Sequence, residues 1–389
     1  MVDTLTDQLL LKNCKLYTSQ DSNSLTDIVI SGHSISRIGK SPVEVECETC
    51  LDAGGRLTVP GFIDIHVQGA GGADVLDGTE NALKTMASSL AKLGTTGFLA
   101  TTVIQPQTHN RHLEKAAALV GKQSDGAALL GIHIEGPFIN EEKRGGISPD
   151  SISSPSGNVL DNILRITGNT LKIMTIAPEL SGSPEIIRRL VDNGIIASFG
   201  HSAATYEETI QGFEFGVSNV THIFNAMPSL HHRTPGPVPA IFETPDISVQ
   251  IISDGVHLHP AIVRMIYHHI GENRCICITD GVQAAGLPEG RYIYNGREYE
   301  SKNGTARYLD GTLIGSTLSL GSIALKFMEI TECSFETAVK TVTANPARLL
   351  GIDSIKGSLD VGKDADIVLL DDDYSVWATL VRGNVCYRK

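Results

Sequence analysis

The stretch LKIMTIAPELSGSPEIIRRLVDNGIIASFGH, residues 171–201, contains two short apolar runs separated by an amphipathic segment. The runs span 171–176 and 195–199, and Pro184 stands where a helix would begin. A strand, a helix and a second strand in this order are typical of a unit in which the two strands lie parallel. The stretch therefore predicts an α/β architecture.

The same alternation continues on both sides of this stretch. Two further amphipathic segments, at 79–93 and 205–215, each open with a Thr, which is a common helix start. We expect eight strands, at 62–67, 97–103, 129–134, 171–176, 195–199, 219–224, 247–252 and 275–279. Eight such β-α units predict a (β/α)8 TIM barrel.

Both ends of the chain show a different pattern, with short apolar segments interrupted by Gly and Pro. We expect residues 1–58 and 358–389 to form one small β-sandwich domain assembled from both termini. Residues 59–357 would then form the barrel, and a helix at 334–350 would lead the chain from the barrel back to the small domain.

The overall charge limits the kinds of partner. The 389 residues carry 31 Lys and Arg against 44 Asp and Glu, a formal net charge of −13. An acidic chain without a basic face is not expected to bind nucleic acid or an anionic membrane. The first eleven residues lack the basic start of a secretory signal, and no apolar run approaches the roughly 18 residues of a membrane helix. We expect a cytoplasmic protein.

Seven cysteines, an odd number in a large chain, favour reduced thiols over a disulfide framework. One C-x-x-C pair, Cys47 and Cys50, stands in the predicted small domain. Its only candidate zinc partners, Cys275 and Cys277, have C-x-C spacing and lie in an apolar run, so we interpret all seven cysteines as structural or incidental.

Polar residues follow the expected strands. The active site of a (β/α)8 barrel lies at the C-terminal ends of its strands, so these residues would share one face. They are Asp64, His66, Gln68, Glu135, His201, His222, Asp254, His257 and Asp280. Any one of them alone would more often be structural, but the whole set on one face predicts a functional site.

Three of these residues form a ligand set. Glu135, His201 and His222 follow different strands, and two imidazoles with one carboxylate leave a coordination position open on Zn²⁺ or a similar ion. Such an ion makes water acidic near neutral pH, and Asp280 could accept the proton and pass it to a leaving group. The sequence thus predicts metal-assisted hydrolysis in a barrel of the metal-dependent hydrolase type.

A basic cluster, His231-His232-Arg233, follows the sixth expected strand. Arg233 could hold a phosphate or carboxylate, with His257 as a second donor, although a solvated loop explains the cluster equally well. Glycine-rich stretches at 69–72, 145–146 and 311–316 are expected to be loops. The chain has no G-x-G-x-x-G after a strand, no Walker pattern and no G-x-S-x-G elbow, so neither nucleotide binding nor a serine hydrolase is indicated.

Seven motifs, read together, resemble the N-acetylglucosamine-6-phosphate deacetylases of the amidohydrolase superfamily. They are VPGFIDIH (59–66), HIEGPF (133–138), GHS (200–202), THIFNAM (221–227), SDGVH (253–257), TDG (279–281) and GSL with DAD (357–359 and 364–366). The resemblance runs from about residue 58 to the C-terminus, and the order of the motifs makes it specific.

The resemblance implies roles for the residues that match the motifs. Glu135, His201 and His222 would hold the metal, and Asp280 would be the general acid and base. Substrate contacts would come from Asn225, Ala226, His257 and Arg233, with Arg233 reaching across a homodimer. The implied substrate is a phosphorylated N-acetyl amino sugar, whose N-acetyl amide would be hydrolysed to acetate and a free amine.

Two positions depart from the family pattern. His66-Val67-Gln68 stands where many superfamily members have H-x-H, so we expect one Zn²⁺ per subunit, with His66 as a weaker second-site ligand. Fe²⁺, Co²⁺ and Mn²⁺ are the alternative metals. Ile147 stands where many family members have a substrate-contacting His. A deacetylase of N-acetylgalactosamine 6-phosphate, a cyclic-amide hydrolase and a metal-free interaction scaffold are the competing functions.

Overall fold

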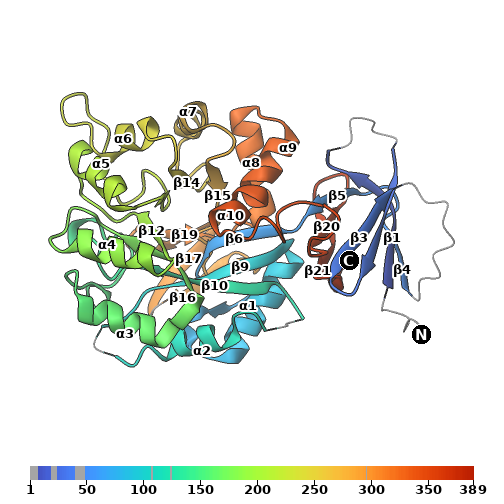
Figure 1. The fold of residues 1–389 in the computed structure, drawn as a ribbon, viewed down its shortest axis with the longest axis horizontal. Helices are drawn as coiled ribbons and strands as arrows, with labels where there is room; N and C mark the ends of the chain where they lie inside the picture. Colours follow the sequence, from blue (N-terminus) through green and yellow to red (C-terminus); the bar gives the residue numbers. More distant parts are fainter. Residues whose placement is uncertain (1–7, 19–23, 40–48, 107, 123–124, 295) are drawn as a thin grey trace.

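The computed structural model describes residues 8–18, 24–39, 49–106, 108–122, 125–294 and 296–389. A barrel of parallel strands surrounded by helices makes up most of the molecule, with a separate sheet beside it (Figure 1). The barrel strands are β6 (Phe62–Val67), β9 (Thr95–Thr102), β10 (Ala128–Glu135), β11 (Leu171–Ile176), β12 (Ile196–Phe199), β13 (Asn219–Val220), β14 (Ser248–Ile251) and β15 (Cys275–Cys277). The predicted (β/α)8 barrel is confirmed.

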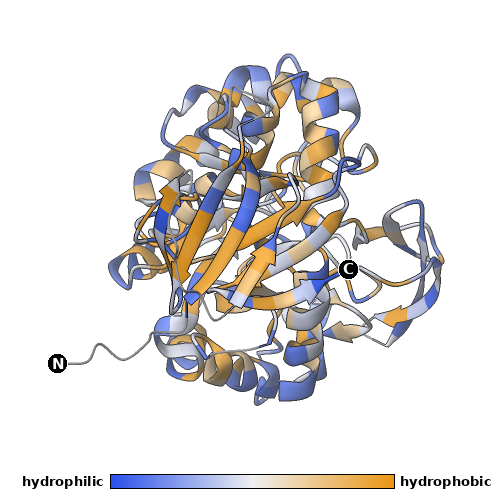
Figure 2. Cartoon of the chain, turned by 90° about the vertical axis from the view of Figure 1, so that its right-hand side faces the viewer, coloured by the Kyte–Doolittle hydropathy of each residue, from blue (hydrophilic) through white to orange (hydrophobic). Residues whose placement is uncertain are grey.

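Helices follow the barrel strands in turn. They are α1 (Glu80–Lys92), α2 (Arg111–Leu119), α3 (Gly157–Thr167), α4 (Ser183–Asp192), α5 (Tyr206–Phe215), α6 (Pro237–Glu243), α7 (Pro260–Ile270) and α8 (Leu320–Thr331). Thr205 begins α5 with a capping box, because its hydroxyl accepts the Glu208 N–H while the Glu208 carboxylate accepts the Thr205 N–H. Figure 2 shows hydrophobic residues concentrated on the strands, whereas the outer helices carry both kinds of residue.

The barrel closes between its first and last strands. The Gln68 N–H donates to the Gly281 carbonyl at 2.8 Å, and the Asp280 N–H donates to the His66 carbonyl at 3.0 Å. This closure brings Asp280, from the end of the chain's last barrel strand, beside His66 and Gln68 from the first.

An antiparallel sheet is inserted between β15 and α8. Its strands are β16 (Gly290–Tyr294), β17 (Arg297–Lys302), β18 (Thr305–Tyr308) and β19 (Leu313–Ser316). The prediction of a loop at 311–316 is therefore wrong for β19. The sequence analysis predicted no strand in this insertion. β17, for example, is mostly charged and buries only Tyr299 and Ser301, so the alternation typical of a half-buried strand is weak there.

The single helix expected at 334–350 is also wrong. The chain forms two helices, α9 (Phe335–Val342) and α10 (Ala344–Leu349), separated by Thr343 with the non-helical angles φ −133° and ψ −80°. Pro346 explains the break, because proline lacks an N–H and its ring would clash with the carbonyl four residues earlier in a continuous helix.

The separate sheet beside the barrel, which we call the terminal sheet, contains strands from both ends of the chain. They are β1 (Gln8–Leu16), β2 (Thr26–Ser31), β3 (Ser34–Gly39), β4 (Thr49–Asp52), β5 (Leu57–Pro60), β20 (Ile367–Leu370), β21 (Val376–Val381) and β22 (Asn384–Arg388). N-terminal β5 pairs with C-terminal β20, and Leu11, Ile30, Ile367 and Leu380 share one apolar core. The expected domain built from both termini is present as a sheet.

Smaller elements complete the described chain. β7 (Gly69–Ala70) and β8 (Ala73–Asp74) form a hairpin, and single 3-10 turns occupy Val75–Asp77, Glu141–Lys143, Pro149–Ser151 and Gly168–Thr170. No helix among the described residues is long and apolar enough to cross a membrane. The six cysteines in the described residues are free; Cys47 of the C-x-x-C pair lies outside the described residues.

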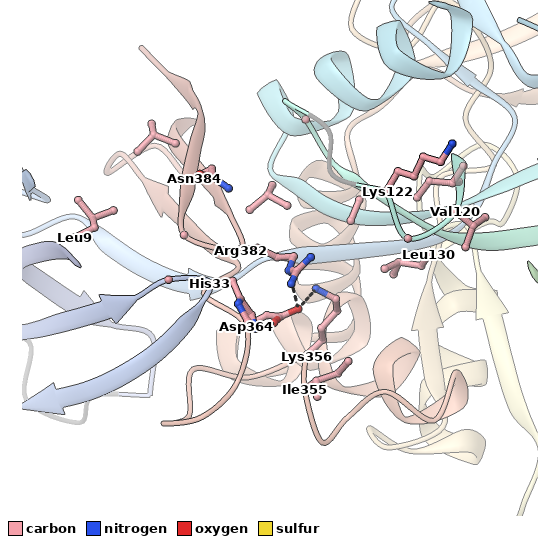
Figure 3. A pocket seen from close by; sticks show the side chains of 18 of the residues that line it. Leu9, His33, Val120, Lys122, Leu130, Ile355, Lys356, Asp364, Arg382 and Asn384 are labelled. Carbon is pink, nitrogen blue, oxygen red and sulfur yellow. Dashed lines mark hydrogen bonds and ion pairs between the residues drawn. The ribbon is translucent and has the colours of Figure 1, made fainter. Parts of the chain in front are cut away.

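A buried ion pair fixes the segment that returns from the barrel to the terminal sheet. The Lys356 ammonium lies 2.7 Å from an Asp364 oxygen and 2.6 Å from an Asp366 oxygen, and the Lys356 side chain is only 6% exposed. Arg382 approaches Asp364 from the other side (Figure 3). Burial alone would lower the pKa of Lys356, but the two carboxylates outweigh it and raise that pKa.

We predict that Lys356→Met lowers the free energy of unfolding by about 3 to 5 kcal/mol, because it leaves the buried Asp366 carboxylate without its cation and Asp364 with only the more distant Arg382. Urea unfolding measures the loss. The control is Lys84→Met, which removes an exposed pair with Glu80 and should cost less than about 1 kcal/mol. Equal effects of the two substitutions would show that the buried pair does not stabilise the fold.

Candidate active site

A cavity of about 160 Å³ opens at the C-terminal ends of the barrel strands. It is lined by most of the polar residues that the sequence placed there, among them Gln68, Glu135, His201, His222, His257 and Asp280. A larger cavity, of about 900 Å³, lies between the terminal sheet and the barrel, but its Lys356 and Arg382 are already paired with Asp364 (Figure 3). The smaller cavity therefore contains the carboxylates and imidazoles that could hold a metal ion and transfer a proton.

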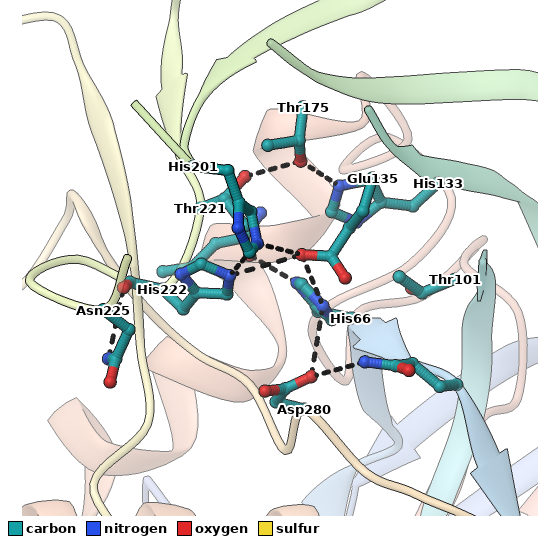
Figure 4. A network of polar contacts seen from close by, with 12 residues as sticks. His66, Thr101, His133, Glu135, Thr175, His201, Thr221, His222, Asn225 and Asp280 are labelled. Carbon is teal, nitrogen blue, oxygen red and sulfur yellow. Dashed lines mark hydrogen bonds and ion pairs between the residues drawn. The ribbon is translucent and has the colours of Figure 1, made fainter. Parts of the chain in front are cut away.

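The predicted ligand set converges in this cavity (Figure 4). Glu135 Oε1 lies 3.3 Å from His201 Nε2 and 3.2 Å from His222 Nε2, and the two Nε2 atoms are 3.1 Å apart. Ligands of a tetrahedral Zn²⁺ with bonds of 2.0 to 2.1 Å stand about 3.3 Å from one another. The three residues thus fit a divalent metal ion.

The hydrogen bond of His201 and the lowered pKa of His222 also suit a cation. His201 donates its Nδ1–H to the Lys143 carbonyl at 2.8 Å, so its Nε2 carries the lone pair that faces Glu135. Burial lowers the pKa of His222, which keeps that ring neutral. The two Nε2 atoms lie 3.1 Å apart and both face Glu135, as two ligands of one cation would.

His201, His222 and the neighbouring Asp280 sit on strained backbone just past short strands. His201, His222 and Asp280 have φ values of +49°, +26° and +46°, a left-handed region that non-glycine residues rarely adopt. β13 accordingly ends at Val220, whereas the apolar run continues to 224. Such strain persists only where the surroundings enforce it, and it occurs mostly at functional sites.

Glu179 braces the loop after His201. Its carboxylate accepts hydrogen bonds from the Ser202 hydroxyl and the Ala203 N–H, both at 2.7 Å, and from the Asn140 amide at 3.1 Å. The sequence analysis missed Glu179, although its place just after β11 was a usable signal.

His66 is held by residues inside neighbouring strands. Its Nδ1 contacts Gln250 Oε1 at 3.1 Å, and Gln250 in turn donates to Asn219 Oδ1 at 2.8 Å. His66 Nε2 then faces Asp280 Oδ1 at 3.3 Å and Glu135 Oε1 at 3.5 Å. Burial alone would lower the pKa of His66, but these carboxylates raise it well above its usual range. Sequence reasoning missed Gln250 and Asn219 because residues within strands look like core.

Asp280 lies at the edge of the ligand set. Its Oδ1 accepts the Gln68 Nε2–H at 2.9 Å, and its Oδ2 is 4.0 Å from His257 Nε2. Burial alone would raise the pKa of Asp280, but hydrogen bonding and attraction from His66 keep it below its usual range. The carboxylate is therefore ionised near neutral pH and can accept a proton.

The predicted substrate-binding residues divide into two groups. Asn225, Ala226 and His257 line the cavity, and His257 is oriented by a 2.6 Å contact between its Nδ1 and Asp254 Oδ2. Arg233 is exposed and does not line the cavity of its own chain. Ile147 contributes an apolar wall.

His133, next to the ligand set, is a core residue. Its Nδ1 contacts the Ile65 carbonyl at 3.1 Å and its Nε2 contacts the Thr175 hydroxyl at 2.9 Å. Burial lowers the pKa of His133 to about 3, so the ring is neutral and both nitrogens are engaged.

Proteins of known activity resemble this chain over almost its whole length. It is 35% identical to the N-acetylglucosamine-6-phosphate deacetylase of Bacillus subtilis (strain 168), with 98% of each chain covered. It is 34% identical to the N-acetylgalactosamine-6-phosphate deacetylase of Escherichia coli O157:H7, with 90% of this chain and 92% of the relative covered.

Solved structures agree with these relatives. The N-acetylglucosamine-6-phosphate deacetylase of Thermotoga maritima is 33% identical, with a TM-score of 0.85 and coverage of 98% of this chain and 100% of the other. A mutant of the Mycobacterium smegmatis enzyme in complex with N-acetyl-D-glucosamine-6-phosphate is 29% identical, with a TM-score of 0.87 and coverage of 98% and 99%. The family model for amidohydrolases matches residues 57–386. The chain belongs to the amidohydrolase family.

Proposed function

We propose that this chain is an N-acetylglucosamine-6-phosphate deacetylase, which hydrolyses the N-acetyl amide of its substrate to glucosamine 6-phosphate and acetate in amino-sugar catabolism or recycling. The observation that carries this proposal is the convergence of Glu135, His201 and His222 beside an ionised Asp280 in one cavity. The relatives named above act on phosphorylated N-acetyl amino sugars, which supports the substrate class.

In the proposed reaction Glu135, His201 and His222 would hold the metal, which would supply the Lewis acidity that makes water nucleophilic at neutral pH. Asp280 takes a proton from the water as its oxygen attacks the amide carbonyl carbon. Asp280 then gives that proton to the amide nitrogen as the C–N bond breaks, which releases the free amine and acetic acid, and the acid ionises to acetate. His66, held by Gln250, points its Nε2 into the site, where it can donate a hydrogen bond to the carbonyl oxygen.

Substrate contacts would come from the loop after β13 and from a second subunit. Asn225, Ala226 and His257 line the cavity and are proposed to meet the sugar phosphate. Arg233 is exposed on the same loop, outside its own cavity, and we propose that it serves the neighbouring subunit of a homodimer.

We propose one Zn²⁺ per subunit. A second metal would need ligands from His66 and Gln68, but His66 Nδ1 is engaged by Gln250, and both ends of the Gln68 amide are engaged, by Asp280 and Tyr294. Only His66 Nε2 remains for a second ion, and a single ligand binds weakly.

The division of the chain and its location are proposed as well. The small domain would comprise 1–58 and 358–389, and the barrel 59–357, which the pairing of β5 with β20 supports. The free cysteines suit a reducing, cytoplasmic compartment.

The second candidate substrate is N-acetylgalactosamine 6-phosphate, the substrate named for the Escherichia coli relative. Ile147 in the cavity wall cannot hydrogen-bond a sugar hydroxyl through its side chain, so one expected determinant of epimer choice is missing. The test incubates zinc-loaded protein with both N-acetyl amino sugars, each with and without the 6-phosphate, and with a cyclic amide. Acetate release confined to a phosphorylated sugar supports the proposal, and hydrolysis of the cyclic amide alone would overturn it.

Asp280→Asn should lower kcat by roughly a hundredfold or more with metal still bound, because an amide cannot take the proton at neutral pH. Steady-state kinetics and elemental analysis on the same preparation measure both quantities. A variant with full metal content and parental kcat would remove Asp280 from the mechanism.

Arg233→Ala should reduce kcat/KM for the 6-phosphorylated sugar and leave the unphosphorylated sugar unchanged, because only the phosphate pairs with a guanidinium. Arg264→Ala, exposed on α7, is the matched control and should change neither. Equal losses on both substrates for Arg233→Ala would contradict its role in phosphate binding.

Metal content after dialysis against a mild chelator should be one equivalent per subunit, in the wild type and in His66→Ala alike. The reason is that His66 Nδ1 and the Gln68 amide already make hydrogen bonds within the protein and are not free to bind a second ion. Two equivalents in the wild type, falling to one in His66→Ala, would show a binuclear site.

A further inference from the structure

The inserted antiparallel sheet is linked to Asp280 by hydrogen bonds along two routes, one through Gln68 and one direct. At one end of the sheet, the Tyr294 hydroxyl donates to Gln68 Oε1, and Gln68 Nε2 donates to Asp280 Oδ1 at 2.9 Å. At the other end, the Ser316 N–H donates to the Asp280 backbone carbonyl at 2.9 Å. The insertion thus contacts the carboxylate through one intermediary and the backbone directly.

We propose that Tyr294 is a positioning residue for the reaction, which sets the orientation of the Asp280 carboxylate through the Gln68 side chain. The inference rests on the proposed function, because it assigns Asp280 the proton transfers. It adds a role for a residue of the insertion.

The hydrogen-bonding chemistry of the three groups permits one arrangement. An ionised carboxylate only accepts hydrogen bonds, so Gln68 must present its NH₂ group to Asp280. The amide oxygen then faces the opposite way, where Tyr294 supplies the donor that it needs. Burial raises the pKa of Tyr294 well above its usual range, so the phenol keeps this proton. Both neighbours therefore select the same orientation of the Gln68 amide.

The fixed amide leaves the two Asp280 oxygens in different surroundings. Oδ1 is held by Gln68 and lies 3.3 Å from His66 Nε2. Oδ2 accepts no hydrogen bond among the described residues and lies 4.0 Å from His257 Nε2, on the cavity side. Oδ2 is thus the oxygen available to accept and return the proton.

The backbone of Asp280 makes this restraint necessary. With φ at +46°, the residue lies in a conformation that only its surroundings maintain. Its N–H is held by the His66 carbonyl and its carbonyl by Ser316. These bonds fix the main chain, but the side chain can still rotate unless Gln68 holds it, and Gln68 is itself a flexible side chain that Tyr294 immobilises.

The test compares two Tyr→Phe variants of the zinc-loaded enzyme from the same strand. Tyr292 lies two residues before Tyr294 on β16, but its hydroxyl donates to the Pro288 carbonyl, outside the cavity lining. We expect Tyr294→Phe to lower kcat about tenfold, the value of one hydrogen bond of about 1.4 kcal/mol, with KM within about twofold and metal content unchanged. Tyr292→Phe should keep the parental kcat.

A double-mutant cycle separates positioning from general loosening of the insertion. Gln68→Met removes the intermediary, so adding Tyr294→Phe to it should change kcat by less than about twofold. Losses that multiply in the double variant, or a parental kcat in Tyr294→Phe, would overturn the inference.

Failure of the proposed function would be recognised separately. If the wild type releases no acetate from any sugar phosphate, crystal structures of the wild type and Tyr294→Phe still decide the inference. A Gln68 amide that turns away from Asp280 in the variant supports it, and a contact kept at the wild-type distance overturns it.

Discussion

The rest of the structure depends on one electrostatic constraint, the burial of the Glu135 carboxylate among converging imidazoles at the mouth of the barrel. Burial alone would raise the pKa of Glu135, but the charge of His66 and the bonds from His201 and His222 hold it well below its usual range. The proposed ligand atoms of Glu135, His201 and His222 lie within 3.3 Å of one another, close to the ligand spacing of tetrahedral zinc. The C-terminal ends of the parallel strands lie on one face of the barrel, which brings these residues close together. β13 is short, and His201 and His222 adopt left-handed backbone conformations, which turn their side chains toward Glu135.

His201 and His66 are each oriented by a group outside the proposed ligand set. His201 is held by the Lys143 carbonyl, and Glu179 braces the residues that follow it. His66 is held by Gln250. These supports come from loops and from within strands, so the geometry of the site is distributed over most of the barrel. The insertion adds a further layer, since Tyr294 and Ser316 both restrain the region of Asp280.

The sequence predicted the barrel because few other folds accommodate eight apolar runs separated by helical segments. In a closed barrel the C-terminal ends of all eight strands lie on one face. It predicted Glu135, His201 and His222 because this donor combination is chemically distinctive. It could not predict Gln250 or Tyr294, since a buried amide and a tyrosine look the same whether they fill space or orient a neighbour. The break at Thr343 was missed because Pro346 acts on the helix several residues upstream, and the insertion because β17 is mostly charged.

The electrostatics of the cavity support the proposal that a neighbouring subunit supplies a cation for the substrate phosphate. Glu135 and Asp280 place two carboxylates at the cavity, Asp254 pairs with His257 in its wall, and the proposed substrate adds a phosphate. The proposed divalent ion and the charge of His66 would balance the carboxylates nearest to them. The phosphate, which His257 is proposed to meet, brings a further charge that the ion and His66 do not balance. Arg233 is exposed on the loop that carries Asn225 and does not line the cavity of its own chain. Two subunits that exchange this loop would each supply the charge that the other lacks.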